Sequence, residues 1–333
     1  MKHQILALAV AALSFTACSN EDNISQDYLA DTPIKLNVSV DEPTTRAGYS
    51  DADKPTGFAL VVEHGSSYGE DKYSYKVLAE WEDNNWKTYD LTQYLTDGTK
   101  KEVTMLWANM NDKVAVKAIS DVAYYAAAAP EISNHPTNQT TPDALKKADF
   151  LAMPYTPVAP TQNGINVEFK HTMSKINLTI ELGSEYEFTE DDVDTKITDV
   201  KIDGSMVKAY YQVSSLTYNP QFTFYGHDGD PTPISPYHTG TTPYSKTNGV
   251  ITKASATYEA ILIPQTIESG KFTVSFKVDG KLYEWTYNKE LTLDPTIAYT
   301  LKLIAGNDKV QPVSFSVAEW GKGNGDGENK ETD

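Results

Sequence analysis

The sequence is constrained most strongly by short segments in which apolar and polar residues alternate. In the first of them, Ile34, Leu36, Val38 and Val40 alternate with polar residues. A period of two places these apolar side chains on one buried face of a β-strand. Similar short segments recur along the chain, separated by Gly, Pro and Asp, and they do not alternate with helical segments. The pattern predicts an all-β fold of antiparallel β-sandwiches.

The remaining strands are predicted from the same signal. They are expected at 58–62, 73–79, 103–107, 114–119, 165–169, 176–182, 197–202, 221–225, 256–263, 272–278, 282–287, 299–304 and 313–317. A short helix is expected at 123–129 and a loop at 133–147. The parity of the apolar positions changes between 165–169 and 176–182, so a β-bulge or a change of sheet is expected near 172–175.

The length of 333 residues suits two domains of this kind. A Pro-rich stretch ends at Pro160, and we place the domain boundary there. The expected organisation is a signal peptide (1–17), an acidic tether (18–31), an N-terminal β-sandwich (32–160), a C-terminal β-sandwich (161–320) and a disordered tail (321–333).

The N-terminus has the features of an export signal. Lys2 and His3 precede the apolar stretch 5–15, which is shorter than the ~20 residues of a membrane-spanning helix. Cys18 follows directly and is the only cysteine in the chain, which excludes an internal disulfide framework and a cysteine-based zinc site. A discarded or buried thiol is one interpretation of Cys18. The other, which we favour, is a lipidation site whose acyl chains anchor the protein in the outer membrane.

Charge and motifs exclude several function classes. The net charge of -18 argues against a nucleic-acid partner, because phosphate contacts need a basic surface. There is no nucleophile elbow, phosphate-binding glycine loop or metal-spaced histidine pair in the sequence. We therefore expect a protein that is not an enzyme, with no catalytic residue, no metal site and no cofactor. His171, beside Lys170 on a predicted strand, is interpreted as structural.

Four short motifs together resemble one family. They are Phe15-Thr16-Ala17-Cys18, Thr44-Thr45-Arg46-Ala47, Val167-Glu168-Phe169-Lys170-His171-Thr172-Met173-Ser174-Lys175-Ile176 and Ser316-Val317-Ala318-Glu319-Trp320-Gly321. In this combination the chain resembles the fimbrillin-like lipoproteins that build type V pili in Bacteroidota. Glu21 and Asp22, which follow the cysteine, resemble the acidic surface-export signal of lipoproteins from the same phylum; an ordinary solvated linker is the alternative.

The resemblance implies two transthyretin-like, Greek-key β-sandwich domains, exported to the cell surface and contributing to cell adhesion in a fimbrium. In that family an arginine-specific protease cuts after the first strand, and a C-terminal strand of another subunit fills the groove. Arg46 is the only arginine among 28 basic residues, so the implied cut falls between Arg46 and Ala47.

The implied exchange assigns a role to two strands. The displaced strand would carry Ile34, Leu36, Val38 and Val40. Its candidate donor counterpart carries Val313, Phe315 and Val317, which have the same period. The implied partners are other pilus subunits, the outer membrane through the lipid on Cys18, and the arginine-specific protease. Whether the C-terminal strand is donated or stays in its own domain is left open by the sequence.

A second interpretation is a surface lipoprotein that never polymerises and binds a glycan or a host protein. Its basis is the high aromatic content, 11% of residues, on a β-sandwich scaffold. A hydrolase is a third interpretation, and no motif supports it.

Overall fold

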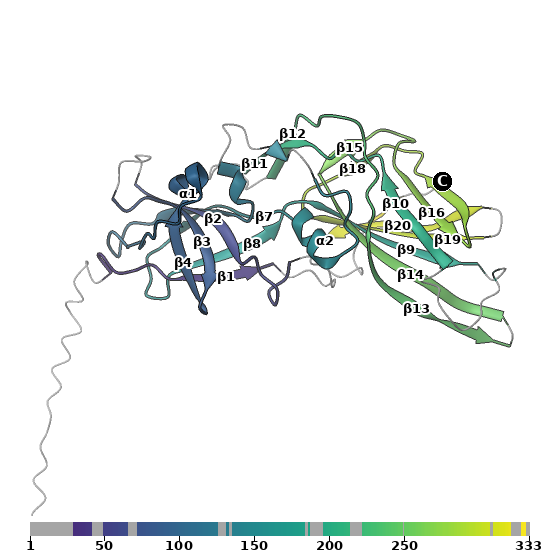
Figure 1. Cartoon of the computed structure of the whole chain (residues 1–333), viewed down its shortest axis with the longest axis horizontal. Coiled ribbons are helices and arrows are strands. Elements are labelled where there is room, and N and C mark those ends of the chain that lie inside the picture. Colours follow the sequence, from purple (N-terminus) through teal and green to yellow (C-terminus); the bar gives the residue numbers. More distant parts are fainter. Residues whose placement is uncertain are drawn as a thin grey trace, which may run out of the picture.

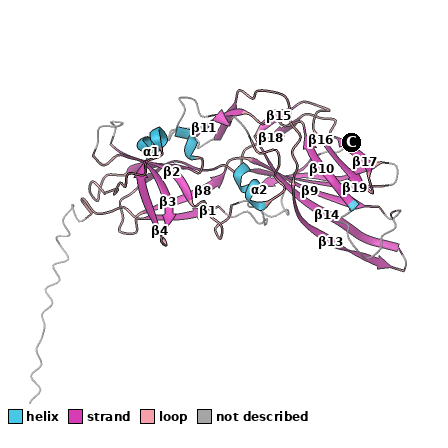
Figure 2. Ribbon diagram, viewed as in Figure 1, coloured by secondary structure: helices cyan, strands magenta, loops and turns pink. Residues whose placement is uncertain are grey.

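The computed structural model describes residues 29–41, 49–65, 72–125, 131–132, 135–183, 186, 196–213, 222–248, 250–306, 309–320 and 328–330. Strands dominate these residues and helices are few and short (Figure 2). The predicted all-β fold is confirmed. The strands form two units that lie side by side along the long axis of the molecule (Figure 1).

One seven-stranded sheet forms the first unit. Its strands, in spatial order, are β1 (Leu36–Val40), β8 (Ile165–His171), β7 (Leu151–Val158), β5 (Val114–Ile119), β2 (Gly57–His64), β3 (Tyr75–Glu82) and β4 (Asn85–Asp90). One face covers an apolar core centred on Phe58, Trp107 and Phe169, which are all buried. The other face is partly covered by helix α1 (Leu91–Asp97), whose Leu91 packs on β2 and β3. A 3₁₀ turn, η1 (Val122–Tyr125), follows β5.

The second unit is a sandwich of two sheets. Its larger sheet contains, in order, β13 (Tyr237–Thr247), β14 (Val250–Leu262), β9 (Ser174–Leu182), β19 (Ile297–Ala305), β20 (Val310–Glu319) and β21 (Glu328–Lys330). The opposite sheet contains β10 (Ile197–Asp203), β16 (Thr273–Val278) and β17 (Lys281–Thr286). Alternate side chains of both sheets point inward and form one continuous core. Most neighbouring strands are antiparallel; β1–β8 and β9–β19 are parallel pairs.

Smaller elements lie between and beside these sheets. They are β6 (Glu131–Ile132), β11 (Ala209–Val213) and β12 (Phe222–Tyr225) in one small sheet, β15 (Gln265–Ile267) paired with β18 (Leu291–Leu293), and helix α2 (Pro142–Ala148). A third apolar cluster joins residues from both units, among them Ala152 of β7, Ile261 of β14 and Trp320. The units are therefore packed against each other through a shared core.

The chain passes from one large sheet to the other between β8 and β9. The expected change of sheet near 172–175 is confirmed, because β8 pairs in the seven-stranded sheet and β9 in the six-stranded one. Our assignment of 165–169 to the C-terminal unit was wrong. Ile165, Val167 and Phe169 point into the first core, and β8 is the strand that β1 pairs with. We therefore propose a domain boundary at 172–173 in place of 160.

Three further expectations need correction. Residues 103–107 form no strand, because their backbone makes only isolated bridges and hydrogen bonds to neighbouring strands. The expected loop at 133–147 contains α2, whose first turn is capped by Thr141 and begins with Pro142. The expected disordered tail contains β21, which pairs with β20. Backbone hydrogen bonds to an open strand edge require no apolar side chains, so the polar composition of the tail concealed this strand.

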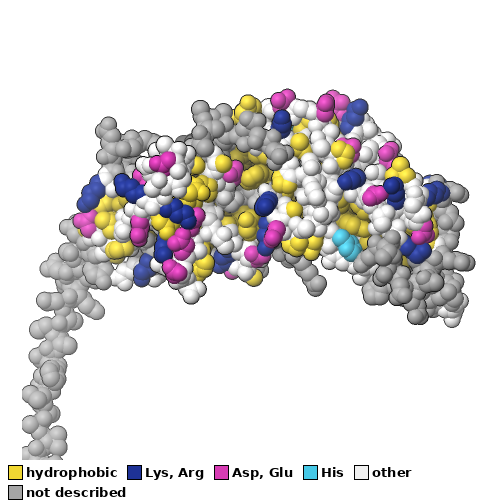
Figure 3. Space-filling view, viewed as in Figure 1, with side chains coloured by type: hydrophobic (Ala, Val, Ile, Leu, Met, Phe, Trp, Pro, Cys, Tyr) yellow, Lys and Arg dark blue, Asp and Glu magenta, His cyan; other side chains and the backbone are white. Residues whose placement is uncertain are grey.

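Within the described ranges, no helix combines the length and the apolar character that a membrane crossing requires. Basic and acidic side chains are interspersed over the face seen in Figure 3. The expected helix at 123–129 is only partly described, as the 3₁₀ turn η1.

Candidate strand-exchange site

β1 lies at the edge of the seven-stranded sheet and pairs with β8 in parallel, from Leu36 opposite Ile165 to Val40 opposite Phe169. The predicted alternation is confirmed. Val38 and Val40 are buried, and Ile34 and Leu36 pack partly buried against the same core. The strand thus closes the first core along one edge.

The backbone of β1 continues the sheet at both of its ends. The amide of Ile165 donates to the carbonyl of Lys35 over 2.8 Å, and the amide of Asp41 donates to the carbonyl of Phe169 over 2.8 Å. The side-chain amide of Asn37 adds a hydrogen bond of 2.9 Å to the carbonyl of Asn163. These bonds fix the register of the strand.

The chain just before β1 is held by a different segment. The amides of Asp31 and Ile34 donate to the carbonyls of Trp107 and Met105, at 2.9 Å each, and the amide of Trp107 donates to Thr32 over 3.0 Å. Leu29 is buried beside them. A displaced β1 would therefore give up its contacts with this segment as well as with β8.

Close packing against Lys35 restricts the turn before β8. Gly164 has a φ of +83°, and a Cβ built on it would lie 2.2 Å from the Lys35 carbonyl oxygen. Only glycine combines this backbone conformation with so close an approach. The turn at Gly164 is thus shaped to the presence of β1.

The expected cleavage site lies outside the described residues, as do Cys18, Glu21 and Asp22. Arg46 and Ala47 fall in the segment 42–48, between Asp41 and Tyr49. After that segment the chain is tied to α2 and its C-terminal cap. The amide of Tyr49 donates to Asp149 Oδ2 over 3.2 Å, and Lys146 pairs with Asp53. Burial, followed by the nearby Asp149 carboxylate, raises the pKa of the Tyr49 hydroxyl.

Asp149 also belongs to a buried polar cluster between the two units. His171 Nδ1 donates to Asp149 Oδ1 over 2.9 Å, and both side chains are buried. The His171 ring stacks on Trp320, with 4.2 Å between ring centroids and 9° between planes. The mid-chain and C-terminal motifs of the sequence therefore meet in space. The structural interpretation of His171 agrees with these contacts.

A buried ion pair completes this cluster. Lys175 Nζ and Glu259 Oε2 are 2.9 Å apart, and Lys175 lies over the Trp320 ring at 5.6 Å from its centroid. Burial lowers the pKa of Lys175 and raises that of Glu259, while the pairing opposes both shifts. Asp149 and Glu259 carried no sequence signal, because their partners lie far away in the chain.

The candidate donor residues lie in β20, inside the six-stranded sheet. β20 pairs with β19 on one side and with β21 on the other. Phe315 is buried among Phe272, Trp285 and Tyr287, whereas Val313 is exposed. In this structure the strand stays in its own unit.

The arrangement of the described side chains does not indicate a metal site. Across the described ranges, no group of three or more His, Cys, Asp or Glu side chains comes close enough to hold an ion.

The sequence of this chain is similar to that of a known protein family. The sequence matches the fimbrillin-like family over residues 45–320, a range that includes β2 to β20 and leaves β1 outside. No curated protein matches the sequence.

Several solved structures are similar to this chain at low sequence identity. A candidate cell adhesion protein from Bacteroides ovatus is 12% identical, with a TM-score of 0.53, and covers 87% of this chain and 98% of its own. One from Bacteroides uniformis is 15% identical, with a TM-score of 0.51 and the same coverages. The tip fimbrial protein Mfa3 from Porphyromonas gingivalis is 11% identical, with a TM-score of 0.41, and covers 86% of this chain and 99% of its own. Because the family match extends over most of the sequence, this chain belongs to the fimbrillin-like family.

Proposed function

We propose that this chain is a structural pilus subunit that is exported as a surface lipoprotein, cleaved after Arg46 and assembled by strand exchange. Its family membership gives it a fimbrial or adhesive role at the cell surface, and a structural role of this kind needs no catalytic site. The protein from Bacteroides ovatus with the same fold is described as a candidate cell adhesion protein. The lipid on Cys18 and the export signal at Glu21 and Asp22 would bring the chain to the outer face of the outer membrane.

The observation that supports strand exchange is the position of β1. It is the first of the described strands, lies at a sheet edge, pairs among these strands with β8 alone and precedes the segment that contains Arg46. Removal of such a strand disconnects no other element, because the next strand, β2, lies at the other side of β5. β1 is therefore a strand that one cut can release.

The physical consequence of its loss is an open, apolar edge. β8 would expose unpaired backbone groups, and the core beneath Val38 and Val40 would lose two side chains worth ~1.5–3 kcal/mol each. An extended strand with alternating apolar residues restores both kinds of contact by β-addition. The cleaved subunit is thereby driven to accept a strand from another subunit.

In strand exchange this chain would also donate a strand of its own, β20, to another subunit. Withdrawing β20 would remove Phe315 from its aromatic surroundings and break its pairing with β19. We propose that β20 stays in place in the free subunit and leaves its sheet only when an acceptor edge compensates for these contacts.

The cleavage step is tested on a purified chain of residues 18–333 treated with an arginine-specific protease. We expect one cut, between Arg46 and Ala47, and no cut in Arg46→Lys, since no second arginine exists. Lys54→Met, a change in the neighbouring segment, is the matched control and should be cut normally. Persistence of the intact chain would refute processing at this position.

The groove is tested with the cleaved chain and a labelled peptide of residues 32–41. The peptide should bind in place of the released strand, and its Val38→Asp variant should not, because a carboxylate would enter the core. Equal binding of both peptides, or of neither, would refute the groove. In that case the non-polymerising surface lipoprotein becomes the better account of the family role.

A further inference from the structure

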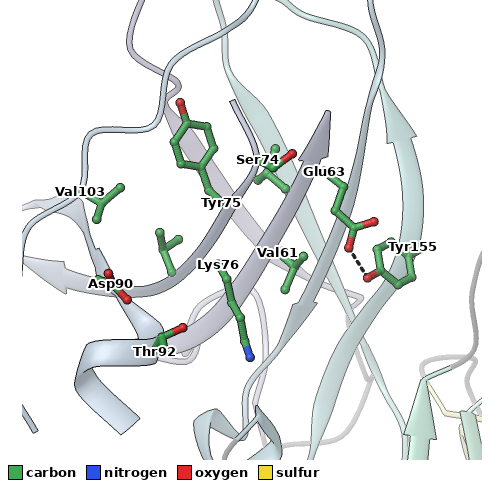
Figure 4. A pocket seen from close by; sticks show the side chains of 11 residues that line it. Val61, Glu63, Ser74, Tyr75, Lys76, Asp90, Thr92, Val103 and Tyr155 are labelled. Carbon is green, nitrogen blue, oxygen red and sulfur yellow. Dashed lines mark hydrogen bonds between the residues drawn. The ribbon is translucent and has the colours of Figure 1, made fainter. Parts of the chain in front are cut away.

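A pocket of about 630 Å³ lies in the first unit, away from β1. It is built from described residues of β2, β3 and β7 and from the start of α1 (Figure 4). Its volume falls within the roughly 300–1,000 Å³ typical of small-molecule sites. The polar residues of this pocket, Glu63, Lys76 and Tyr155, take no part in the proposed strand exchange.

One side of the pocket is an ordered polar pair. The hydroxyl of Tyr155 donates to Glu63 Oε1 over 2.5 Å, so this carboxylate is fixed in orientation (Figure 4). Beneath it, Lys117 Nζ lies 4.7 Å from the centroid of the Tyr155 ring. Burial lowers the pKa of Lys117 to about 8, and the Glu63 carboxylate opposes this shift.

Strand pairing brings a second ammonium group to the same face. Val61 is opposite Lys117 on one side and opposite Lys76 on the other, so the three side chains form a row across the sheet. In Figure 4 Lys76 lies between Tyr155 and Thr92. Asp90 and Thr92, at the start of α1, line the far side of the pocket.

These groups set the charge of a suitable ligand. The lining holds two carboxylates, Glu63 and Asp90, and one ammonium group, Lys76, while Lys117 lies beneath it against the Tyr155 ring. Such a lining gives an anion no net attraction, and the molecule's net charge of -18 repels anions further. An anionic ligand is therefore disfavoured.

The side chains that line the pocket indicate which class of ligand it would bind. Carboxylates only accept hydrogen bonds and ammonium groups only donate them, so a ligand that does both at neighbouring atoms satisfies the two kinds together. Sugar hydroxyl groups have this property. The apolar side chain of Val61, with the Tyr155 ring, matches the C–H face of a sugar ring.

We propose that this pocket binds a neutral saccharide unit, with Glu63 and Lys76 holding adjacent hydroxyl groups and Tyr155 positioning Glu63. This gives the subunit a ligand-binding role that is independent of its assembly. Tyr155 acts through the carboxylate it orients, so its hydroxyl sets the geometry of the site.

The test uses the intact chain and the methyl glycosides of glucose, galactose, mannose and N-acetylglucosamine, with glucuronate as the charged comparator. Saturation-transfer NMR detects binding and titration gives the dissociation constant. At least one neutral glycoside should bind, and Glu63→Gln and Lys76→Met should each weaken it about tenfold, as expected for loss of a charge-assisted hydrogen bond. Tyr155→Phe keeps the ring and should weaken binding less than Glu63→Gln does. Lys277→Met, in the second unit, is the control and should bind normally.

Three results would overturn the proposal. They are no binding of any glycoside at tens of millimolar, binding that the pocket variants leave unchanged, and tighter binding of glucuronate than of every neutral probe. Thermal unfolding of each variant shows that a loss of binding does not come from a loss of fold. Because the chain is uncleaved in this assay, its failure leaves the strand-exchange proposal untouched.

Discussion

At the scale of single residues, Asp149 connects distant parts of the molecule. Its carboxylate accepts from the amide of Tyr49 and from His171, which stacks on Trp320. One side chain thereby links the segment after the expected cleavage site to the end of β20. No sequence spacing could have revealed this, because the partners lie 100 and 22 residues away.

Asp149→Ala should destabilise the protein by about 2–4 kcal/mol, because two buried donors lose their acceptor. Asp149→Asn should cost less, since its amide oxygen still accepts one of the two bonds. Urea unfolding gives both values. Lys277→Ala, which removes an exposed partner of Asp199, is the control and should cost under about 1 kcal/mol. Equal costs for Asp149→Ala and Lys277→Ala would contradict this role.

His135 gives the protein a predictable acid sensitivity. It is fully buried and donates through Nε2 to the Ile261 carbonyl over 2.7 Å. Burial lowers its pKa from 6.5 to about 4. Between these values the unfolded chain binds a proton that the folded chain does not, so stability is full above about pH 6.5 and falls as the pH drops toward 4.

The predicted loss is about 3 kcal/mol over this interval, at about 1.4 kcal/mol per pKa unit. His135→Gln should flatten the dependence of the unfolding free energy on pH between 4 and 7 by about this amount. His238→Gln keeps His135 and should follow the wild-type curve. An unchanged slope in His135→Gln would show that another group controls the acid sensitivity.

At the scale of elements, alternation predicted the position of most strands and the buried faces of β1, β8 and β9, whereas Val313 of β20 is exposed. The predicted range 114–119 is β5, and the parity change near 172–175 is the passage between sheets. Alternation reports which side chains are buried but not which strand lies next to which. The strand 165–169 was therefore assigned to the wrong unit. α2 was missed because its capping residues, Thr141 and Pro142, lie in a stretch whose composition resembles a loop.

The pairing of β1 with β8 can be probed without changing either strand. Gly164→Ala should destabilise the protein by at least about 2 kcal/mol more than Gly98→Ala. Both glycines have positive φ, but a Cβ at 164 would clash with the backbone of Lys35, whereas nothing lies within 4 Å at 98. In the chain 47–333, which lacks Lys35, the difference should shrink toward zero. A difference that persists there would mean that Gly164 does not report on β1.

At the scale of the whole molecule, two units share a core, and the first unit ends in an edge strand, β1, whose removal we propose. The all-β architecture followed from the sequence alone, because alternation extends over most of the chain. The pocket beside Tyr155 did not, since its lining comes from β2, β3, β7 and α1, which only the folded sheet brings together. Assembly and ligand binding would thus use separate parts of the first unit.

The N-terminal residue of the surface-assembled protein tests strand exchange most directly. N-terminal sequencing or mass spectrometry of polymers sheared from cells measures it. We predict that chains in the polymer begin at Ala47 and that Arg46→Lys cells make no polymer. Polymers whose chains still begin at lipidated Cys18, with β1 attached, would contradict strand exchange at β8.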